Sequence, residues 1–231
     1  MRRRSTPVPR DAVHHPLFAR FYARMSVTAD LKGGVAAHRE ELLAGLSGRV
    51  IEVGAGNGLN FAHYPGAVSE VVAIEPERSL RQLAAGAALR AEVPVDVVPG
   101  TAEALPVKSE AFDAAVASLV LCTVRDLPRA LAEIKRVLRP GGELRFFEHT
   151  LDPGGALASA QRAVDRTFWP RLFGGCHTAR DTVAAIEAAG FEWGVCRRFR
   201  IPDRGVRLPS SPCVIGVARR SVVLDGPAEG S

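Results

Sequence analysis

The sequence of 231 residues predicts an α/β fold in one domain, with a mostly parallel sheet whose strands alternate with helices. Three observations lead to this prediction. An apolar run at residues 49–53 breaks into a glycine-rich turn at 54–58, after which a helical pattern begins. Up to residue 148, further β-branched runs alternate with amphipathic stretches of about 10–15 residues, which is typical of right-handed β–α–β crossovers. Glycines and prolines separate the runs, as at Pro140-Gly141-Gly142, where a helix should stop.

The first part of the chain is expected to lie outside the sheet. Residues 1–13 are basic and contain prolines, so we expect them to be poorly ordered. Apolar side chains then recur at helical spacing, which predicts a helix from His15-Pro16 onward that Gly33-Gly34 breaks, and a second helix at residues 35–46. Residues 1–47 are therefore expected to form a helical extension that packs on the sheet or covers a ligand.

The remaining elements are predicted by the same patterns. Strands are expected at 49–53, 70–75, 94–98, 112–118 and 143–148, with helices at 77–91 and 126–138. Further on we expect a helix at 155–168, a loop at 169–175, a helix capped by Thr178 or Asp181, and an antiparallel hairpin of strands at 191–201 and 212–218. The domain should span residues 48–220 and end in a flexible tail at 221–231.

Composition and charge disfavour several classes of function. The net charge is +5, but the basic residues are scattered and do not alternate with aromatic residues, so we expect no nucleic-acid partner. No run of about 18 apolar residues and no secretory signal is found, which predicts a cytoplasmic protein without a transmembrane segment. The sequence has four cysteines, Cys122, Cys176, Cys196 and Cys213, and they form no C-x-x-C pair. This spacing indicates a reducing compartment and argues against a structural zinc site, so no metal is expected.

The glycine-rich turn and one acid indicate a nucleoside ligand. Gly54-x-Gly56-x-Gly58 lets the backbone approach a ligand closely, but its third glycine comes one residue too early for a dinucleotide fingerprint. Glu75 ends the second predicted strand, where a carboxylate can accept both hydroxyls of a ribose. A tight strand–helix turn and a solvated acid are the alternatives.

A larger set of motifs resembles the class I S-adenosylmethionine-dependent methyltransferases. Over residues 48–148 the chain reads Glu-x-Gly-x-Gly-x-Gly, a strand-end acid, Gly-x-Ala-Glu-x-Leu-Pro, Phe-Asp and Val-Leu-Arg-Pro-Gly-Gly. The resemblance implies their Rossmann-like fold of seven strands with an antiparallel last strand, S-adenosylmethionine as cofactor and S-adenosylhomocysteine as product. The expected cofactor-binding residues are Tyr22, Glu52, Gly54, Ala55, Gly56, Asn60, Glu75, Pro76, Thr101, Ala102, Glu103, Ser118, Leu119 and Val120.

The resemblance also implies which residues bind each part of the cofactor. The methionine end should lie on residues 54–58, the ribose on Glu75, and the adenine near Ala102 and Glu103. Tyr22 is expected either to close over the methionine end or to pack in the core.

A narrower resemblance concerns the acceptor. Residues 119–124, Phe147-Glu148-His149, Trp169, Gly175-Cys176 with Arg180, and Leu208-Pro209 are similar to the microsomal alkyl-thiol methyltransferases and their bacterial relatives. This implies methylation of a small-molecule thiol, with reduced disulfide natural products among the candidates, by a monomer or homodimer. The apolar N-terminal anchor of the animal enzymes is absent from this sequence, so a membrane role is not expected.

The reaction requires an aligned nucleophile and the exclusion of water. A free thiol with a pKa of about 8.5 is mostly un-ionised at neutral pH, so a neutral histidine near the methyl group would help. His149 is the first candidate for this base and His177 the second, with a structural role as the alternative. The expected acceptor pocket, for which core packing is the alternative, comprises Cys122, Phe168, Trp169, Phe173, Cys176 and Arg180.

Other functions stay open at this point. The core motifs do not encode the acceptor, so O-, N- or C-methylation of a lipid, quinone or natural product is the main alternative. Amino-group methylation of nucleic-acid bases is disfavoured because Ser118-Leu119-Val120-Leu121 stands where an Asn/Asp-Pro-Pro-aromatic motif would be needed. An NAD-dependent oxidoreductase and a non-catalytic nucleoside-binding protein are the alternatives of another class.

Overall fold

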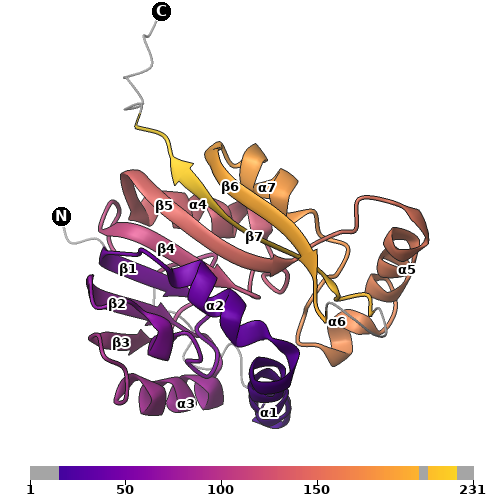
Figure 1. Ribbon diagram of the computed structural model, residues 1–231, viewed down its shortest axis with the longest axis horizontal. Coiled ribbons are helices and arrows are strands. Elements are labelled where there is room, and N and C mark those ends of the chain that lie inside the picture. The colour runs from indigo at the N-terminus through magenta and orange to yellow at the C-terminus, as the bar shows by residue number, and fades with distance from the viewer. Residues whose placement is uncertain (1–15, 203–207, 223–231) are drawn as a thin grey trace, which may run out of the picture.

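The computed structural model describes residues 16–202 and 208–222. Seven strands form one sheet in the order β3-β2-β1-β4-β5-β7-β6 (Figure 1). The strands are β1 Gly48–Val53, β2 Val68–Ile74, β3 Val95–Val98, β4 Phe112–Ser118, β5 Leu138–His149, β6 Phe191–Arg200 and β7 Pro212–Arg220. The first five are parallel, and β7 is antiparallel to both of its neighbours. This confirms the predicted fold class.

Helices cover both faces of the sheet. They are α1 Pro16–Gly33, α2 Val35–Leu43, the short 3₁₀ helix η1 Phe61–His63, α3 Arg78–Ala88, α4 Leu127–Val137, α5 Gly155–Asp165, α6 Trp169–Leu172 and α7 Thr182–Ala188. One apolar core joins one face to α4 and α7, and a second joins the other face to α2 and α3. Because β4 is buried on both faces, it reads as a nearly continuous apolar run.

Strand β5 and residues 169–172 differ from the sequence-based expectation, and one of the two expected caps of α7 is observed. Strand β5 begins at Leu138, directly after α4, because Leu138 already pairs with Phe112 before the register shifts. Residues 169–172, expected as a loop, form the short helix α6 with Pro170 in its first turn, where proline is tolerated. Asp181 caps α7 through its Oδ1, which accepts from the N–H of Ala184 at 3.1 Å.

Two expectations lie outside the described residues, namely the poor order of residues 1–13 and most of the flexible tail. Within the described ranges, no helix is both long enough and apolar enough to span a bilayer.

The topology assembles a site at one edge of the sheet. Because β1, β2, β4 and β5 are parallel, their carboxyl ends meet there, and the loops that follow them come together. Helices α5 and α6 lie beyond this end of the sheet (Figure 1).

Candidate functional site

The conformation of the loop after β1 favours glycine at two positions. Gly54 and Gly56 have φ angles of +72° and +58°. A Cβ on Gly54 would lie 2.3 Å from Cγ2 of Val120, which follows β4. The N–H groups of Gly54 and Ala55 donate to the carbonyl of Ile74 at 2.8 and 3.0 Å, so the loop is tied to the end of β2.

Glu75 is fixed beside this loop. Its Oε2 accepts from the N–H of Gly56 and its Oε1 from the N–H of Glu77, both at 2.8 Å. Burial raises the pKa of Glu75 to about 7 in spite of these two bonds and of the Arg81 charge. Each carboxylate oxygen keeps a lone pair that can accept a ligand hydroxyl.

Tyr22 brings α1 into the site. A Cβ on Gly56 would meet its ring at 3.4 Å and its hydroxyl at 3.7 Å, so the phenol lies over the loop. Burial raises the pKa of Tyr22 to about 12, and the acidic groups of Glu75, Cys122 and Glu148 disfavour the phenolate further. The phenol therefore lies over a loop that is tied to the end of β2 and packs against Val120, in the loop after β4.

A buried arginine links the helical extension to two loops. Arg39 of α2 donates to Asp30 at 2.9 Å, to Oδ1 of Asn60 at 2.7 Å and to Oγ of Ser118 at 3.2 Å. Sequence reasoning missed Arg39, because one arginine in a short helix carries no pattern that distinguishes it from a solvated one. A charge can be buried here because three acceptors surround it.

Glu52 and Asn60, both expected to contact the cofactor, form hydrogen bonds with each other and with other buried side chains. Asn60 donates to Oε1 of Glu52 at 2.9 Å, and the hydroxyl of Tyr64 donates to Oε2 at 2.8 Å. Burial raises the pKa of Glu52 to about 7. These buried side chains support the glycine loop from the interior of the protein.

The turn after β3 forms the next side of the site. Thr101 pairs with Ala104 in an isolated bridge, and Ala102 is buried. Oε1 of Glu103 accepts from the N–H of Arg125 at 2.9 Å, so this carboxylate also holds the start of α4. Pro76 stands in the loop after β2, where its carbonyl accepts from Arg81 at 3.0 Å.

A buried acid orders the loop after β4. Leu119 has a φ of +56°, which is rare for a residue with a side chain. Beyond it, the carboxylate of Glu148 accepts from the N–H groups of Val120 and Leu121 at 2.9 Å and of Cys122 at 3.3 Å. The acid in the apolar run Phe146-Phe147-Glu148 was a signal that it has buried partners.

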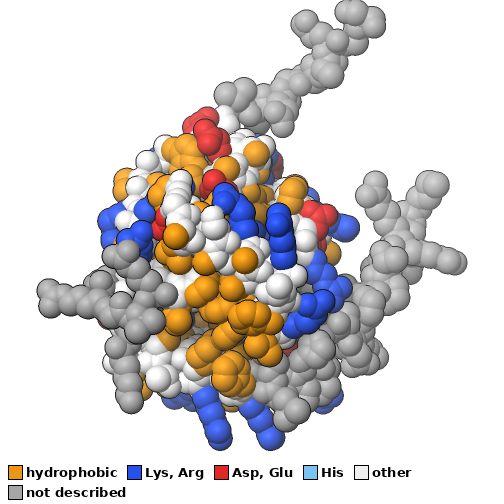
Figure 2. Space-filling view, turned by 90° about the vertical axis from the view of Figure 1, so that its right-hand side faces the viewer, with side chains coloured by type: hydrophobic (Ala, Val, Ile, Leu, Met, Phe, Trp, Pro, Cys, Tyr) orange, Lys and Arg blue, Asp and Glu red, His pale blue; other side chains and the backbone are white. Residues whose placement is uncertain are grey.

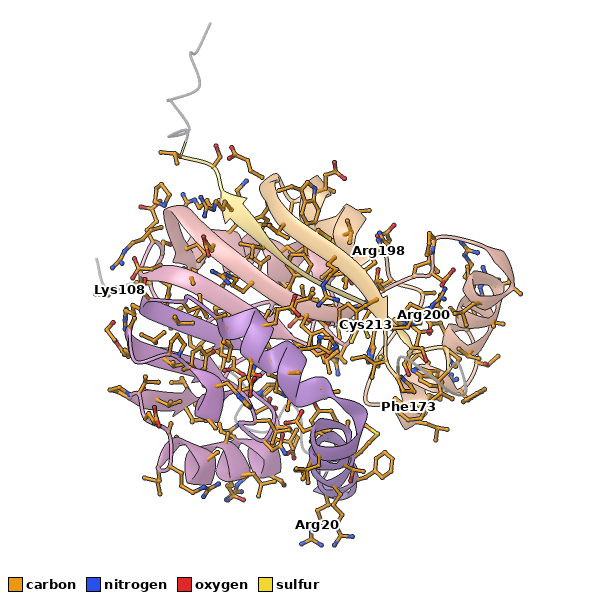
Figure 3. All side chains as sticks on the ribbon, in the orientation of Figure 1. Arg20, Lys108, Phe173, Arg198, Arg200 and Cys213 are labelled. Atoms are coloured by element: carbon orange, nitrogen blue, oxygen red, sulfur yellow. The ribbon has the colours of Figure 1, made fainter. Side chains whose placement is uncertain are left out.

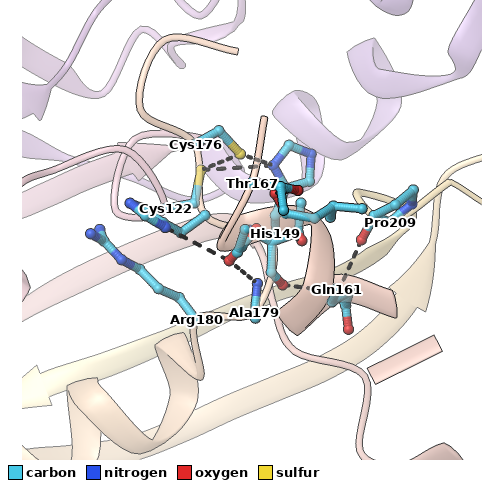
Figure 4. A network of polar contacts seen from close by, with 12 residues as sticks. Cys122, His149, Gln161, Thr167, Cys176, Ala179, Arg180 and Pro209 are labelled. Carbon is cyan, nitrogen blue, oxygen red and sulfur yellow. Dashed lines mark hydrogen bonds and ion pairs between the residues drawn. The ribbon is translucent and has the colours of Figure 1, made fainter. Parts of the chain in front are cut away.

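Two thiols and an imidazole converge at the ends of β4 and β5 (Figure 4). Nδ1 of His149 lies 3.7 Å from Sγ of Cys122 and 3.6 Å from Sγ of Cys176, and the sulfurs are 3.7 Å apart. The contact between the two sulfurs lowers the pKa of Cys176 to about 5 and raises the pKa of Cys122. The imidazole of His149 further favours the Cys176 thiolate. These residues, separated by 27 positions at each step, form one polar cluster.

Aromatic residues of α6 pack beside this cluster. Trp169 stacks on Phe173 with centroids 4.2 Å apart, and Trp169 packs with the two cysteines. Figure 3 shows Phe173 at α6, beyond the ends of the strands. Phe168 is 50% exposed, and its ring centroid lies 6.4 Å from that of Trp169.

The second candidate histidine and Arg180 have different neighbours. The backbone N–H of His177 donates to the carbonyl of Cys122 at 2.8 Å, but its ring lies 3.7 Å from Asp165. Arg180 donates to the carbonyl of Leu121 at 2.7 Å. Both residues therefore connect the 176–180 segment to the loop after β4.

Gln161, which sequence reasoning missed, holds the loops of this region together. Its Nε2 donates to the carbonyls of Thr150 at 3.1 Å and of Thr178 and Pro209 at 2.9 Å. Its Oε1 accepts from the N–H of Asp152 at 2.8 Å. No periodicity marks such a residue, because its partners are backbone groups of distant segments.

The surface at this end of the molecule is partly apolar. Figure 2 views this end and shows hydrophobic side chains gathered over it. The exposed large hydrophobic residues of α1 and of the α6 region include Phe21, Met25, Phe168 and Leu172.

Comparisons with known proteins agree on one family. A family model described as a methyltransferase domain matches residues 51–146. The thiol S-methyltransferase TMT1B of Homo sapiens is 34% identical over 183 residues, which cover 76% of this chain and 73% of that protein. The ubiquinone/menaquinone biosynthesis C-methyltransferase UbiE of Syntrophotalea carbinolica is 33% identical over 170 residues, with coverage of 69% and 70%.

Solved structures share the fold. A methyltransferase-like structure from Bacillus halodurans has a TM-score of 0.67 at 17% identity and covers 82% of this chain and 100% of that chain. A structure from Thermotoga maritima, whose name describes a SAM-dependent methyltransferase, has a TM-score of 0.65 at 23% identity, with coverage of 89% and 98%.

Proposed function

Since this chain belongs to the S-adenosylmethionine-dependent methyltransferases, we propose that the thiol of a small molecule accepts the methyl group that it transfers. The methyl donor is S-adenosylmethionine. The observation that carries the thiol assignment is the similarity to thiol S-methyltransferases, at 34% identity over 76% of this chain.

The residues at the carboxyl edge fit the cofactor. A backbone cradle closed by Tyr22 exists at Gly56, where any Cβ would touch the phenol. A buried carboxylate at Glu75, aimed by two backbone N–H groups, is an acceptor suited to two vicinal hydroxyls. We therefore propose that Glu75 binds the ribose, and that the loop and Tyr22 enclose the methionine end.

The remaining roles follow from position. Bound there, the cofactor supplies an electrophilic methyl group next to the loop after β4. Ala102 and the turn after β3 would adjoin the adenine, while Arg39 and Glu148 hold the loops in position. Helices α1 and α2 would form a lid that keeps water from the reacting atoms.

The acceptor sulfur would bind at the cluster of two cysteines and His149. The cluster lies at the ends of β4 and β5, and Val120, two residues before Cys122, packs against Gly54 of the glycine loop. Trp169 and Phe173 would provide an apolar wall for the acceptor. The role of His149 as a base stays a prediction, as does that of His177, whose ring lies near Asp165.

C-, O- or N-methylation is the second candidate. The similarity to a quinone C-methyltransferase, at 33% identity, favours it.

We propose that the protein acts in the cytoplasm on small molecules and not on nucleic acids, as a monomer or homodimer.

An acceptor panel tests the proposal. The purified protein is incubated with S-adenosylmethionine and with small alkyl thiols, reduced disulfide natural products, phenols, quinols or amines, and S-adenosylhomocysteine is quantified. Thiols should give product. Turnover of phenols, quinols or amines with no thiol methylated would reject the thiol assignment and favour the second candidate.

A further inference from the structure

We propose that Cys122, His149 and Cys176 bind a zinc ion that leaves one position free for the acceptor thiolate. The first half of this inference stands on the geometry of the cluster. The second half rests on the proposed function.

The distances match one tetrahedral ion. With Zn–S bonds of about 2.3 Å and Zn–N bonds of about 2.0–2.1 Å, tetrahedral angles place two sulfurs about 3.8 Å apart and a sulfur and a nitrogen about 3.6 Å apart. The protein holds the Cys122 and Cys176 sulfurs 3.7 Å apart, and Nδ1 of His149 lies 3.7 and 3.6 Å from them. A disulfide would need about 2.0 Å between sulfurs. One ion could therefore bind all three atoms with little movement.

The chemistry of the ligand set points to the same metal. Thiolate and imidazole ligands suit zinc, and carboxylate-rich sites suit magnesium or calcium. Two thiols and an imidazole from three separate segments meet within 4.8 Å at one point. The loop bearing Cys176 comes this close because Gly175, at φ +87°, leaves room for the carbonyl of Thr123, which a Cβ would approach to 3.2 Å.

The surroundings orient the ligands as the outer shell of a metal site does. Glu148 and the N–H of His177 fix the backbone of Cys122 on both sides. Among the described residues, no acceptor forms a hydrogen bond with the buried Nε1–H of Trp169. The Trp169 side chain packs against Cys176, whose sulfur, as a metal-bound thiolate, would accept from this N–H.

Three protein ligands leave a fourth position open, as in catalytic rather than structural zinc sites. Among the described residues, no fourth side chain of ligating type joins the cluster. Glu148, whose oxygens accept from three backbone N–H groups, is not among the groups that meet at this point. Since Val120, two residues before Cys122, packs against Gly54 of the glycine loop, an acceptor in this position would be near the methyl donor.

The reaction balances without another reactant. The acceptor thiol binds zinc and releases its proton to solvent, because a coordinating thiol is deprotonated. A sulfur electron pair then forms the new S–CH₃ bond while the bond from the sulfonium to the methyl group breaks, giving a thioether and S-adenosylhomocysteine. The neutral thioether, a weaker ligand than the thiolate, leaves the metal. In this scheme the metal replaces a general base, and His149 acts as its ligand.

Sequence spacing alone predicts no such site. The ligands are 27 residues apart at each step, without a C-x-x-C pair. Only the adjacency of β4 and β5 and the return of the 173–178 segment bring them together.

Metal analysis of the full chain tests the site. The protein is purified under reducing conditions, incubated with zinc, separated from free metal, and analysed for zinc by mass spectrometry. We expect about one ion per chain, lost in Cys122→Ser and in Cys176→Ser and kept in the control Cys196→Ser, an exposed cysteine. Circular dichroism and S-adenosylhomocysteine binding verify that each variant is folded. Equal zinc contents in the wild type and in a folded Cys122→Ser protein would overturn the site.

Cobalt reports on the open position. Replacement of zinc by Co²⁺ should give the visible absorption of a tetrahedral cobalt–thiolate centre, and 2-mercaptoethanol should change this spectrum in the absence of any methyl donor. An unchanged spectrum would overturn thiol coordination. A spectrum that responds to the thiol in a protein that methylates only phenols or amines would keep the metal site and reject the proposed function.

Discussion

The carboxylate of Glu75, at the end of β2, accepts a 2.8 Å hydrogen bond from the backbone N–H of Gly56 in the loop after β1. This bond joins the two parts of the proposed cofactor site. An acid that is buried and already oriented can bind hydroxyl donors without further ordering.

Glu75→Gln should weaken S-adenosylhomocysteine binding by about tenfold or more, because a hydrogen bond to a charged group contributes about 1.5–3 kcal/mol. Calorimetry measures the loss. Glu92→Gln, on the surface after α3, is the control. Unchanged affinity in Glu75→Gln would remove this residue from the ribose site.

The affinity for S-adenosylhomocysteine should rise as the pH rises through about 7. The pKa of Glu75 is raised to about 7 by burial, so the free protein holds this carboxyl largely neutral at lower pH. Hydroxyl donors favour the ionised form, so binding at about pH 6 should release a proton. Calorimetry in buffers of different ionisation enthalpy counts that proton.

The raised pKa of Glu75 should also make the stability of the free protein depend on pH. A carboxyl whose pKa is raised on folding stabilises the free protein at low pH, and this contribution is lost as the pH rises through about 7. Glu52 and Glu148 share this direction, so the comparison with Glu75→Gln isolates the Glu75 part. For the affinity prediction, the control is Glu75→Gln. If its affinity for S-adenosylhomocysteine depends on pH as that of the wild type does, the assignment of Glu75 to the ribose is contradicted.

Gly54→Ala should destabilise the protein by at least about 2 kcal/mol and abolish cofactor binding, because strain and overpacking add. The new Cβ would lie 2.3 Å from Val120, at a φ of +72°. Gly45→Ala is a matched control, since Gly45 has a φ of +74° but nothing within 4 Å. It should cost about 1–2 kcal/mol from the backbone alone. Urea denaturation of both variants measures the difference, and equal losses would refute the close packing of Val120 on the loop.

Gln161→Leu should lower the free energy of unfolding by about 2–4 kcal/mol, because it leaves buried carbonyls and an N–H without partners. The side chain is fully buried and bonds to Thr150, Thr178, Pro209 and Asp152. Gln82→Leu, on the exposed side of α3, should change stability by less than about 0.5 kcal/mol. Chemical denaturation compares the two, and a neutral Gln161→Leu would mean that the loops are held by other contacts.

His149→Ala should reduce turnover by at least about a hundredfold while the affinity for S-adenosylhomocysteine changes by less than about threefold. The imidazole lies against the two thiols, and the hydrogen bonds of Glu75 are made elsewhere. His63→Ala, in η1, is the control. Steady-state kinetics and calorimetry separate the two effects, and wild-type turnover in His149→Ala would exclude it from the mechanism.

The position of the glycine turn beside Glu75 could be predicted because these residues are close in sequence. The glycine turn and Glu75 are separated by one helix-forming stretch and one strand, and the parallel fold fixes their relation. Arg39 and Gln161 could not be predicted, because their partners are distant groups that only the tertiary structure brings near.

The acceptor side shows a different limit. Cys122, His149 and Cys176 were each predicted individually, but not their convergence. That convergence depends on the β4–β5 pairing and on the close approach of Gly175 to Thr123. Chemistry that is shared between distant residues becomes visible only when the distances are known.

The most direct test of the central claim uses one acceptor that offers two atoms. 2-Mercaptoethanol carries a thiol and a hydroxyl on the same small molecule, so both compete for the methyl group at equal concentration. After incubation with S-adenosylmethionine labelled in its methyl carbon, NMR of the product distinguishes an S-methyl from an O-methyl group. We predict a label only on sulfur, and a label on oxygen would contradict the account.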